Sequence, residues 1–121
     1  DLHSFPTRRS SDLEIVSEMP FEDNSFDIVT GFETIYFWPD FINDLKEVNR
    51  VLKKDGMVFF CNEAVYREGK MEKYDDLVEL LDMKIYSEEV LKQSLEETGF
   101  KDFKAYINEE NDWICVTARK I

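Results

Sequence analysis

The chain lacks residues and loops on which several common kinds of catalysis depend. Its glycines are scattered at Gly31, Gly56, Gly69 and Gly99, so no G-x-G-x-x-G turn brings backbone close to a bound nucleoside. The one histidine, His3, lies in a segment that looks non-native, which leaves no imidazole to activate a nucleophile or bind zinc. Hydrolase triads and metalloenzymes are therefore disfavoured. No metal site is predicted, and no residue is assigned a catalytic role.

Long apolar segments and a cysteine framework are also missing. No apolar run approaches the roughly 20 residues that a membrane-spanning helix needs, and no signal peptide is visible. Cys61 and Cys115 each lie in an apolar, strand-like run, where a thiol is more often a buried small hydrophobic group than half of a disulfide. We therefore expect a cytoplasmic protein in a reducing compartment, with unpaired thiols and no membrane partner.

Positive charge is scarce. With 27 acidic and 15 Lys or Arg residues, the formal net charge is −12 at pH 7. Such a surface repels phosphate backbones, so no nucleic-acid partner is expected and a small molecule is the better substrate class.

The first residues differ in character from the rest. Residues 4–13 read SFPTRRSSDL, which is similar to the translation of a sequencing-library adapter, and such segments are excluded from fold reasoning. We interpret residues 1–13 as a non-native tail; the alternative is a genuine polar N-terminal tail. The remaining residues 14–121, with the chain's 43% hydrophobic content, suit one domain.

Apolar periodicity alternates between strand and helix, which predicts an α/β layered domain. A first strand is expected over residues 26–32. Asp40 is placed to cap the next helix, because its carboxylate can accept hydrogen bonds from unpaired backbone N–H groups. Gly56 is expected to provide a positive φ in the turn to a buried parallel strand over residues 57–61. The apolar stripe of the capped helix is Phe41, Ile42, Leu45, Val48, Val51 and Leu52.

The second half predicts two helices and a hairpin. One helix is expected over residues 73–83. The next begins after the capping residue Ser87 and ends at Gly99. A half-exposed strand around residues 103–108, a turn at 109–112 and a strand over 113–118 then form an antiparallel hairpin.

Two motifs make the chain resemble a known family. Residues 19–27 read MPFEDNSFD and lead into the first expected strand, and residues 50–56 read RVLKKDG and lead into the second. Similar runs precede the fourth and fifth sheet strands of the class I S-adenosylmethionine-dependent methyltransferases. The resemblance runs from about residue 14 to the C-terminus. It implies a partial Rossmann-like sheet, in the order strand, helix, strand, two helices and antiparallel hairpin, with the family's first three strands missing.

Two departures from the family pattern limit what carries over. Lys54 and Asp55 stand where the family usually has Pro and a first Gly, and Gly56 is kept. Ile15 and Val16 stand where a polar and a small residue are usual. We therefore do not expect the side chains that directly precede Met19 to recognise adenine.

The resemblance implies transfer of a methyl group from S-adenosyl-L-methionine to a small-molecule acceptor. It places Met19, Phe32 and Glu33 beside the cofactor, and Tyr36 and Trp38 around the acceptor. The residues also allow plainer roles: helix packing for Phe32, a solvated carboxylate for Glu33, and a hydrophobic lid over the following helix for Tyr36 and Trp38.

Other functions stay open. The missing glycine-rich loop and the acidic surface also suit a non-catalytic α/β interaction module, and a nicotinamide dehydrogenase half would share the layered fold. If the chain is a truncated methyltransferase fragment, we expect it to be inactive alone. We also expect it to self-associate, because its first strand would present an unpaired edge.

Overall fold

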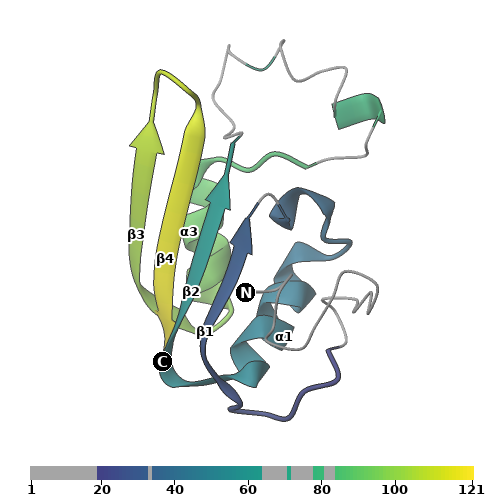
Figure 1. Cartoon of the computed structure of the whole chain (residues 1–121), viewed down its shortest axis with the longest axis vertical. Helices are drawn as coiled ribbons and strands as arrows, with labels where there is room; N and C mark the ends of the chain where they lie inside the picture. The colour runs from purple at the N-terminus through teal and green to yellow at the C-terminus, as the bar shows by residue number, and fades with distance from the viewer. Residues whose placement is uncertain (1–18, 33, 64–70, 72–77, 81–83) are drawn as a thin grey trace.

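The computed structural model describes residues 19–32, 34–63, 71, 78–80 and 84–121, and its elements alternate between strand and helix (Figure 1). This confirms the predicted α/β class. The predicted helix over residues 73–83 lies mostly outside the described residues, of which 78–80 are helical. The elements are β1 (Phe26–Phe32), η2 (Ile35–Phe37), α1 (Phe41–Val51), β2 (Leu52–Asn62), α3 (Glu88–Glu97), β3 (Phe100–Asn108) and β4 (Trp113–Lys120).

The four described strands form one mixed sheet in the order β1-β2-β4-β3. β1 and β2 are parallel, whereas β4 runs antiparallel to both β2 and β3. The predicted C-terminal hairpin is confirmed, and its second strand lies between β2 and β3. The carboxyl ends of β1 and β2 therefore meet the amino end of β4 at one edge of the sheet, which we call the carboxyl edge. The opposite end, where β1 and β2 begin, is the amino edge.

Helix α1 follows the predicted pattern. Asp40 caps it by accepting a hydrogen bond from the backbone N–H of Asn43 at 3.4 Å, which satisfies one of the donors left free at a helix start. Its buried stripe includes Leu45, Val48 and Val51, each with no exposed surface, and packs this helix on the sheet.

The turn into β2 differs from the prediction. β2 begins at Leu52, immediately after α1, and not at residue 57. The left-handed φ of 64° falls on Asp55, and Gly56 does not have a positive φ. A β-carbon at Gly56 would lie 2.7 Å from the backbone oxygen of Lys53, so glycine is required there for close approach of the backbone.

Helix α3 and the hairpin agree with the prediction. The Ser87 hydroxyl accepts from the backbone N–H of Val90 at 3.2 Å, and Gly99, at φ 94°, ends the helix. β3 and β4 extend further than predicted, to the bounds given above.

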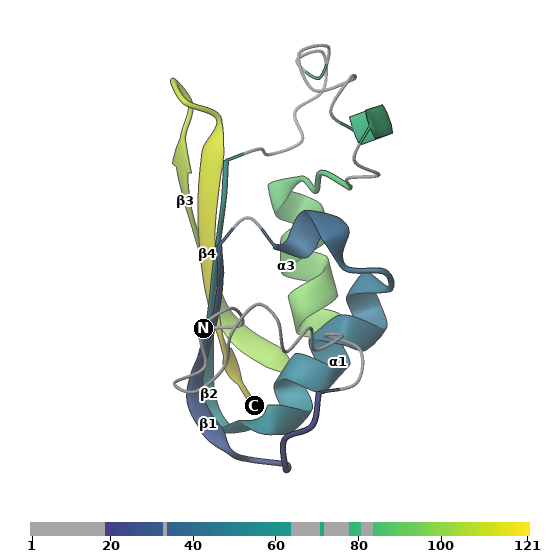
Figure 2. The same ribbon diagram turned by 45° about the vertical axis from the view of Figure 1, so that its right-hand side comes forward.

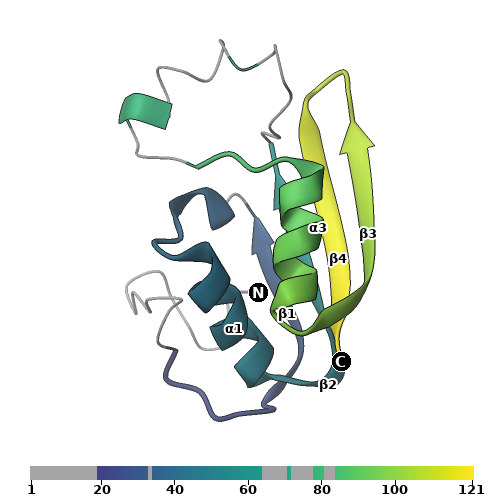
Figure 3. The same cartoon turned by 180° about the vertical axis from the view of Figure 1, so that it is seen from behind.

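Both α1 and α3 lie on one face of the sheet (Figures 2 and 3). The core fills the space between these helices and the sheet, and its fully buried side chains include Phe60, Phe100, Leu91 and Ile114. No helix in the described part of the chain covers the other face, which we call the open face. By strand alternation it carries Ile28, Thr30, Phe32, Met57, Phe59, Cys61, Trp113, Cys115, Thr117 and Tyr106.

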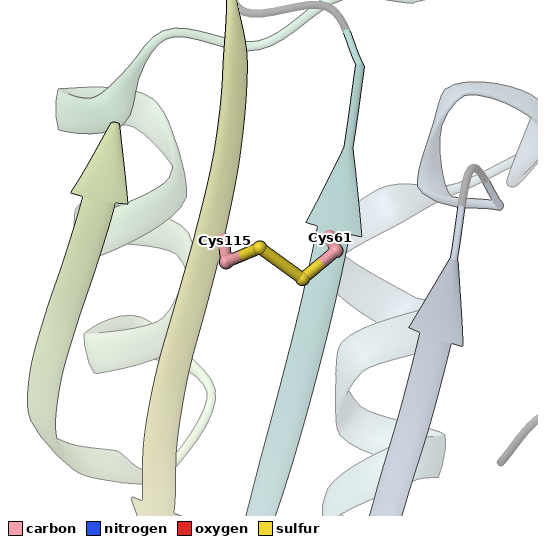
Figure 4. The surroundings of a disulfide bond; sticks show 2 residues. All are labelled: Cys61 and Cys115. Atoms are coloured by element: carbon pink, nitrogen blue, oxygen red, sulfur yellow. A yellow bond between two sulfur atoms is a disulfide. The ribbon is translucent and has the colours of Figure 1, made fainter. Parts of the chain in front are cut away.

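The two cysteines form a disulfide on this open face (Figure 4). The prediction of unpaired thiols is therefore wrong. Cys61 and Cys115 lie 54 residues apart, yet the β2–β4 register sets them directly opposite each other with a Cα–Cα distance of 4.1 Å. That register is a tertiary feature, so the sequence pattern around each cysteine could not show it.

None of the helices in the described ranges is long and apolar enough to cross a membrane.

Candidate functional site

A hollow of about 410 Å³ opens at the carboxyl edge of the sheet. The register aligns Phe32, the last residue of β1, with Cys61 of β2, and Cys61 with Cys115 of β4. The disulfide thus lies between Phe32 and the Trp113 end of β4. The Phe32 side chain is 46% exposed, and its ring contacts that of Phe59 edge-on at 6.0 Å. The lining residues are Phe32, Cys61, Asn62, Glu63, Trp113 and Cys115.

Two polar side chains at this edge have buried atoms without a hydrogen-bond partner. The atoms are the hydroxyl oxygen of Thr34 and the amide nitrogen and oxygen of Asn62. Among the described residues, no other buried side-chain nitrogen or oxygen lacks a hydrogen-bond partner. Asn62 is only 3% exposed. Buried polar groups are nearly always satisfied, so these atoms have unused capacity for a water or ligand partner. Strand alternation places the Asn62 side chain on the helix-covered face, opposite Cys61.

Sequence reasoning did not single out Asn62 or Trp113. A signal for Asn62 exists, because this polar residue directly follows the apolar run of residues 57–61 at the end of a buried parallel strand. Ligands of open α/β sheets bind beyond such strand ends. Trp113 carries no comparable signal, since only the sheet order brings the start of β4 to this edge.

Of the two predicted cofactor residues that the structure describes, Phe32 lines the hollow and Met19 does not. Met19 is buried at the amino edge, where its backbone N–H donates to Glu47 at 3.0 Å and its carbonyl accepts from Arg50 at 3.0 Å. Glu33 lies outside the described residues. The structure therefore does not bring Met19 and Phe32 together.

The predicted acceptor residues are both buried. Tyr36 is 3% and Trp38 6% exposed. The Trp38 ring packs against Phe41 at 6.0 Å and edge-on against Phe60 at 5.4 Å. This placement agrees with the alternative that the sequence left open, a hydrophobic lid over the following helix.

Tyr86 extends the aromatic cluster above α1. Its ring stacks on Phe41 with 4.4 Å between centroids. Burial, and next the nearby carboxylate of Asp44, raises the pKa of the Tyr86 hydroxyl above its usual value. The raised pKa keeps this hydroxyl in its neutral form to a higher pH than an exposed tyrosine.

Across the described ranges, no three His, Cys, Asp or Glu side chains are grouped so as to hold a metal ion. The carboxyl edge instead offers aromatic surface, a buried amide and a carboxylate. The aromatic surface of Phe32 and Trp113 can contact an organic ligand on the open face.

Comparison with known proteins adds two kinds of similarity. Residues 7–60 match a family model described as a methyltransferase domain. The matched range includes β1, α1 and most of β2. It begins inside residues 1–13, whose non-native origin stays a prediction.

Individual proteins agree with this match. The chain is 58% identical over 41 residues to demethylmenaquinone methyltransferase of Staphylococcus aureus, covering 34% of this chain but only 17% of that enzyme. A solved S-adenosylmethionine-dependent methyltransferase of Thermotoga maritima shares the fold with a TM-score of 0.75 at 23% identity, covering 88% of this chain and 61% of its own. Phosphoethanolamine N-methyltransferase 2 of Haemonchus contortus, solved with S-adenosylhomocysteine, gives 0.76 at 18% identity, covering 87% and 36%.

Proposed function

Because the chain carries the motifs and the partial fold of the class I S-adenosylmethionine-dependent methyltransferases, we propose that its whole protein methylates a small-molecule acceptor. This chain covers less than two thirds of the length of each relative reported above. The cofactor, the acceptor and the activity of the whole protein are therefore parts of the proposal. So is the absence of nucleic-acid and membrane partners. The expected cytoplasmic location stays a prediction, and the Cys61–Cys115 disulfide removes the unpaired thiols that favoured it.

The observation that carries the proposal is the carboxyl edge. It combines an exposed aromatic side chain, Phe32, with the unpaired amide of Asn62 and the unpaired hydroxyl of Thr34. In open α/β sheets this edge is where ligands bind. The amino edge has no such unpaired side chains among the described residues.

Methyl transfer from a sulfonium is a direct displacement, so it needs alignment and a dry site but no metal or covalent enzyme intermediate. S-adenosylmethionine, when bound, supplies the activated methyl group. Phe32 fits a position beside that group because an aromatic ring attracts a nearby cation. The residues present fit only part of a cofactor site, since no glycine-rich turn occurs in the sequence.

We further propose that this chain alone is inactive and that it self-associates. β1 is an outer strand of the described sheet. On the open face, Ile28 and Phe32 of this strand are each 46% exposed. Apolar surface of this kind promotes association between copies. A clean monomer that unfolds cooperatively on heating would contradict this part of the proposal.

Titration calorimetry with S-adenosylhomocysteine tests the function. We expect the full-length protein to bind this ligand and the 121-residue chain to bind it weakly or not at all. Tight binding by the chain would show a more complete pocket than we propose. Absence of binding by the full-length protein would remove the enzyme assignment and favour the non-catalytic interaction module.

A further inference from the structure

A second hollow, of about 270 Å³, lies on the open face of the β3–β4 hairpin, towards the amino edge. The register sets Lys104 of β3 opposite Thr117 of β4, so both side chains share the open face, and Arg119 follows two positions along β4. All three residues line the hollow, together with Asp102. With two basic residues and one acidic residue, this cationic hollow has a net positive charge in a chain whose formal net charge is −12.

The basic residues of the cationic hollow can accommodate a further acidic partner. Lys104 forms no ion pair with any described residue, whereas the neighbouring Lys101 pairs with Asp55 at 3.1 Å. Arg119 donates one N–H to the Asp55 carbonyl at 3.0 Å, and a guanidinium has further donors. A carboxylate that enters the hollow would therefore gain an ammonium and a guanidinium as partners.

The turn of the same hairpin supplies carboxylates of this kind. Glu109 and Glu110 lie in the turn between β3 and β4, and both are exposed. This turn stands at the carboxyl edge of the sheet (Figure 2). Neither glutamate forms an ion pair with a described residue. The side-chain oxygen of Asn108 holds the turn in shape by accepting from the backbone N–H groups of Glu110 at 3.0 Å and Asn111 at 3.1 Å.

This arrangement of charge is complementary to itself. Lys104 and Glu110 lie six positions apart in the sequence, which is roughly 20 Å along an extended hairpin. If two copies stack their open faces with the hairpins antiparallel, each turn lies over the cationic hollow of the other copy. The two-fold axis then passes near residue 107, where Tyr106, which is 55% exposed, and Trp113 place aromatic surface on the open face. Protein–protein interfaces commonly have such an aromatic centre with a polar rim.

We propose that the open face of the hairpin is a two-fold interface between two copies of this chain, in which Glu110 of each copy enters the cationic hollow of the other. Each copy contributes one turn and one hollow, so the contacts are complete within the pair and the assembly closes as a dimer. The chain itself carries the carboxylate that the hollow fits, which favours a second copy over another partner. This interface goes beyond the association through β1 proposed above, because it uses β3 and β4 and depends on charge.

Sedimentation velocity of the 121-residue chain tests the interface. At about 0.15 M salt the Debye length is about 8 Å, which screens the net repulsion between two acidic copies more than it screens contacts inside a hollow. We expect a dimer whose fraction rises with protein concentration. Lys104→Glu and Glu110→Lys should each weaken this dimer by about tenfold or more, because symmetry repeats each like-charge contact twice.

A mixture of these two variants gives the decisive measurement. In the mixed pair, each contact between positions 104 and 110 again joins opposite charges. The equimolar mixture should therefore dimerise about as strongly as the original chain, although each variant alone is mostly monomeric. The double variant, with both changes in one chain, should dimerise for the same reason.

Matched controls separate the interface from the effect of total charge. Lys92→Glu and Glu96→Lys make the same charge changes at exposed positions of α3, on the other side of the sheet, and should leave the dimer unchanged. Tyr106→Ser should weaken the dimer by about tenfold, because it removes an aromatic side chain from the centre of the interface. Circular dichroism checks that each variant is folded.

Three results would overturn the inference: an original chain that stays monomeric, a dimer that Lys104→Glu weakens no more than Lys92→Glu does, or a mixture that stays monomeric. Association that survives both charge changes but disappears in Ile28→Lys would also overturn it, and would leave the association through β1 intact. Binding of S-adenosylhomocysteine by the full-length protein does not depend on this interface, so the proposed function and the dimer fail separately.

Discussion

The two edges of the sheet are built on different principles. At the amino edge, long charged side chains reach backbone and carboxylate oxygens and leave no buried side chain unpaired among the described residues. At the carboxyl edge, polar side chains are buried without partners and aromatic rings flank a hollow.

Arg50 and Lys120 hold the amino edge together. Arg50 pairs with Glu47 at 2.6 Å and with Asp23 at 2.7 Å, and it donates to the Met19 carbonyl. The ammonium of Lys120 donates to the carbonyls of Asn49 and Leu52, each at 2.7 Å, at the negative end of α1. Helix α1, the start of β2 and the end of β4 are therefore tied by satisfied hydrogen bonds.

The contrast indicates a division of labour within one small sheet. Satisfied polar networks stabilise the fold, whereas buried polar groups without partners lower its stability. Near the carboxyl edge the Cys61–Cys115 disulfide links β2 to β4, and the rings of Phe32 and Phe59 contact each other. Four predictions test this division.

The largest effect is expected from the covalent link. The variant Cys61→Ser with Cys115→Ser should lower the free energy of unfolding by about 2–4 kcal/mol, because the disulfide closes a long loop and restricts the unfolded chain. The sequence separation is 54 residues. Urea unfolding measures the change. Dithiothreitol should lower the stability of the original chain by a similar amount and have no effect on the double variant; equal urea midpoints with and without reductant in the original chain would contradict the prediction.

The next effect concerns the backbone at the amino edge. Gly56→Ala should destabilise the chain by about 1–3 kcal/mol, since the new β-carbon meets the Lys53 carbonyl and the fold must shift. Thermal unfolding gives the change in midpoint. Asp55→Gly serves as the control, because it relieves a left-handed φ of 64° without adding an atom and should change stability much less. A tolerated alanine at position 56 would show that the close approach is not required.

A matched pair of polar-to-apolar changes compares the edges directly. Arg50→Met should cost about 1–2 kcal/mol, a modest value because 32% of this side chain is exposed and solvent screens its charges. Asn62→Leu should leave stability unchanged or raise it, since it removes an unpaired buried amide. Lys53→Met is the control for the loss of a surface ion pair. The Lys53 ammonium lies 3.6 Å from the Asp27 carboxylate, and both side chains are exposed. A cost at Asn62 as large as at Arg50 would contradict the division.

The smallest effect is a pH dependence at the amino edge. The Arg50 hydrogen bond holds the pKa of the Glu47 carboxyl below its usual value of 4.5. A lowered pKa in the folded state stabilises the fold above the unfolded value, and this contribution is lost as the pH falls below 4.5 through the folded pKa. Glu47→Gln should therefore flatten part of the acid-unfolding profile measured by circular dichroism. An unchanged profile would show that Glu47 does not contribute.

Local signals in the sequence determined most of the fold. Asp40 and Ser87 cap their helices, Gly99 ends the second, and apolar stripes decide which helix faces are buried, because each effect acts within a few residues. The family motifs also pointed correctly to the methyltransferase fold. Phe32 ends β1 as predicted, and its role beside a cofactor stays a prediction.

Tertiary structure alone decided the site. The burial of Tyr36 and Trp38, which lie outside the strands, depends on how their segment packs against α1 and the sheet. The pairing of Cys61 with Cys115 and the position of Trp113 at the same edge as Phe32 depend on the β1-β2-β4-β3 order and its register. A one-residue change of register would turn each of these strand residues to the other face, so residue type and spacing cannot fix such contacts. The sequence by itself determined which segments form strands and helices, and the packing of distant segments decided where this protein leaves room for a ligand.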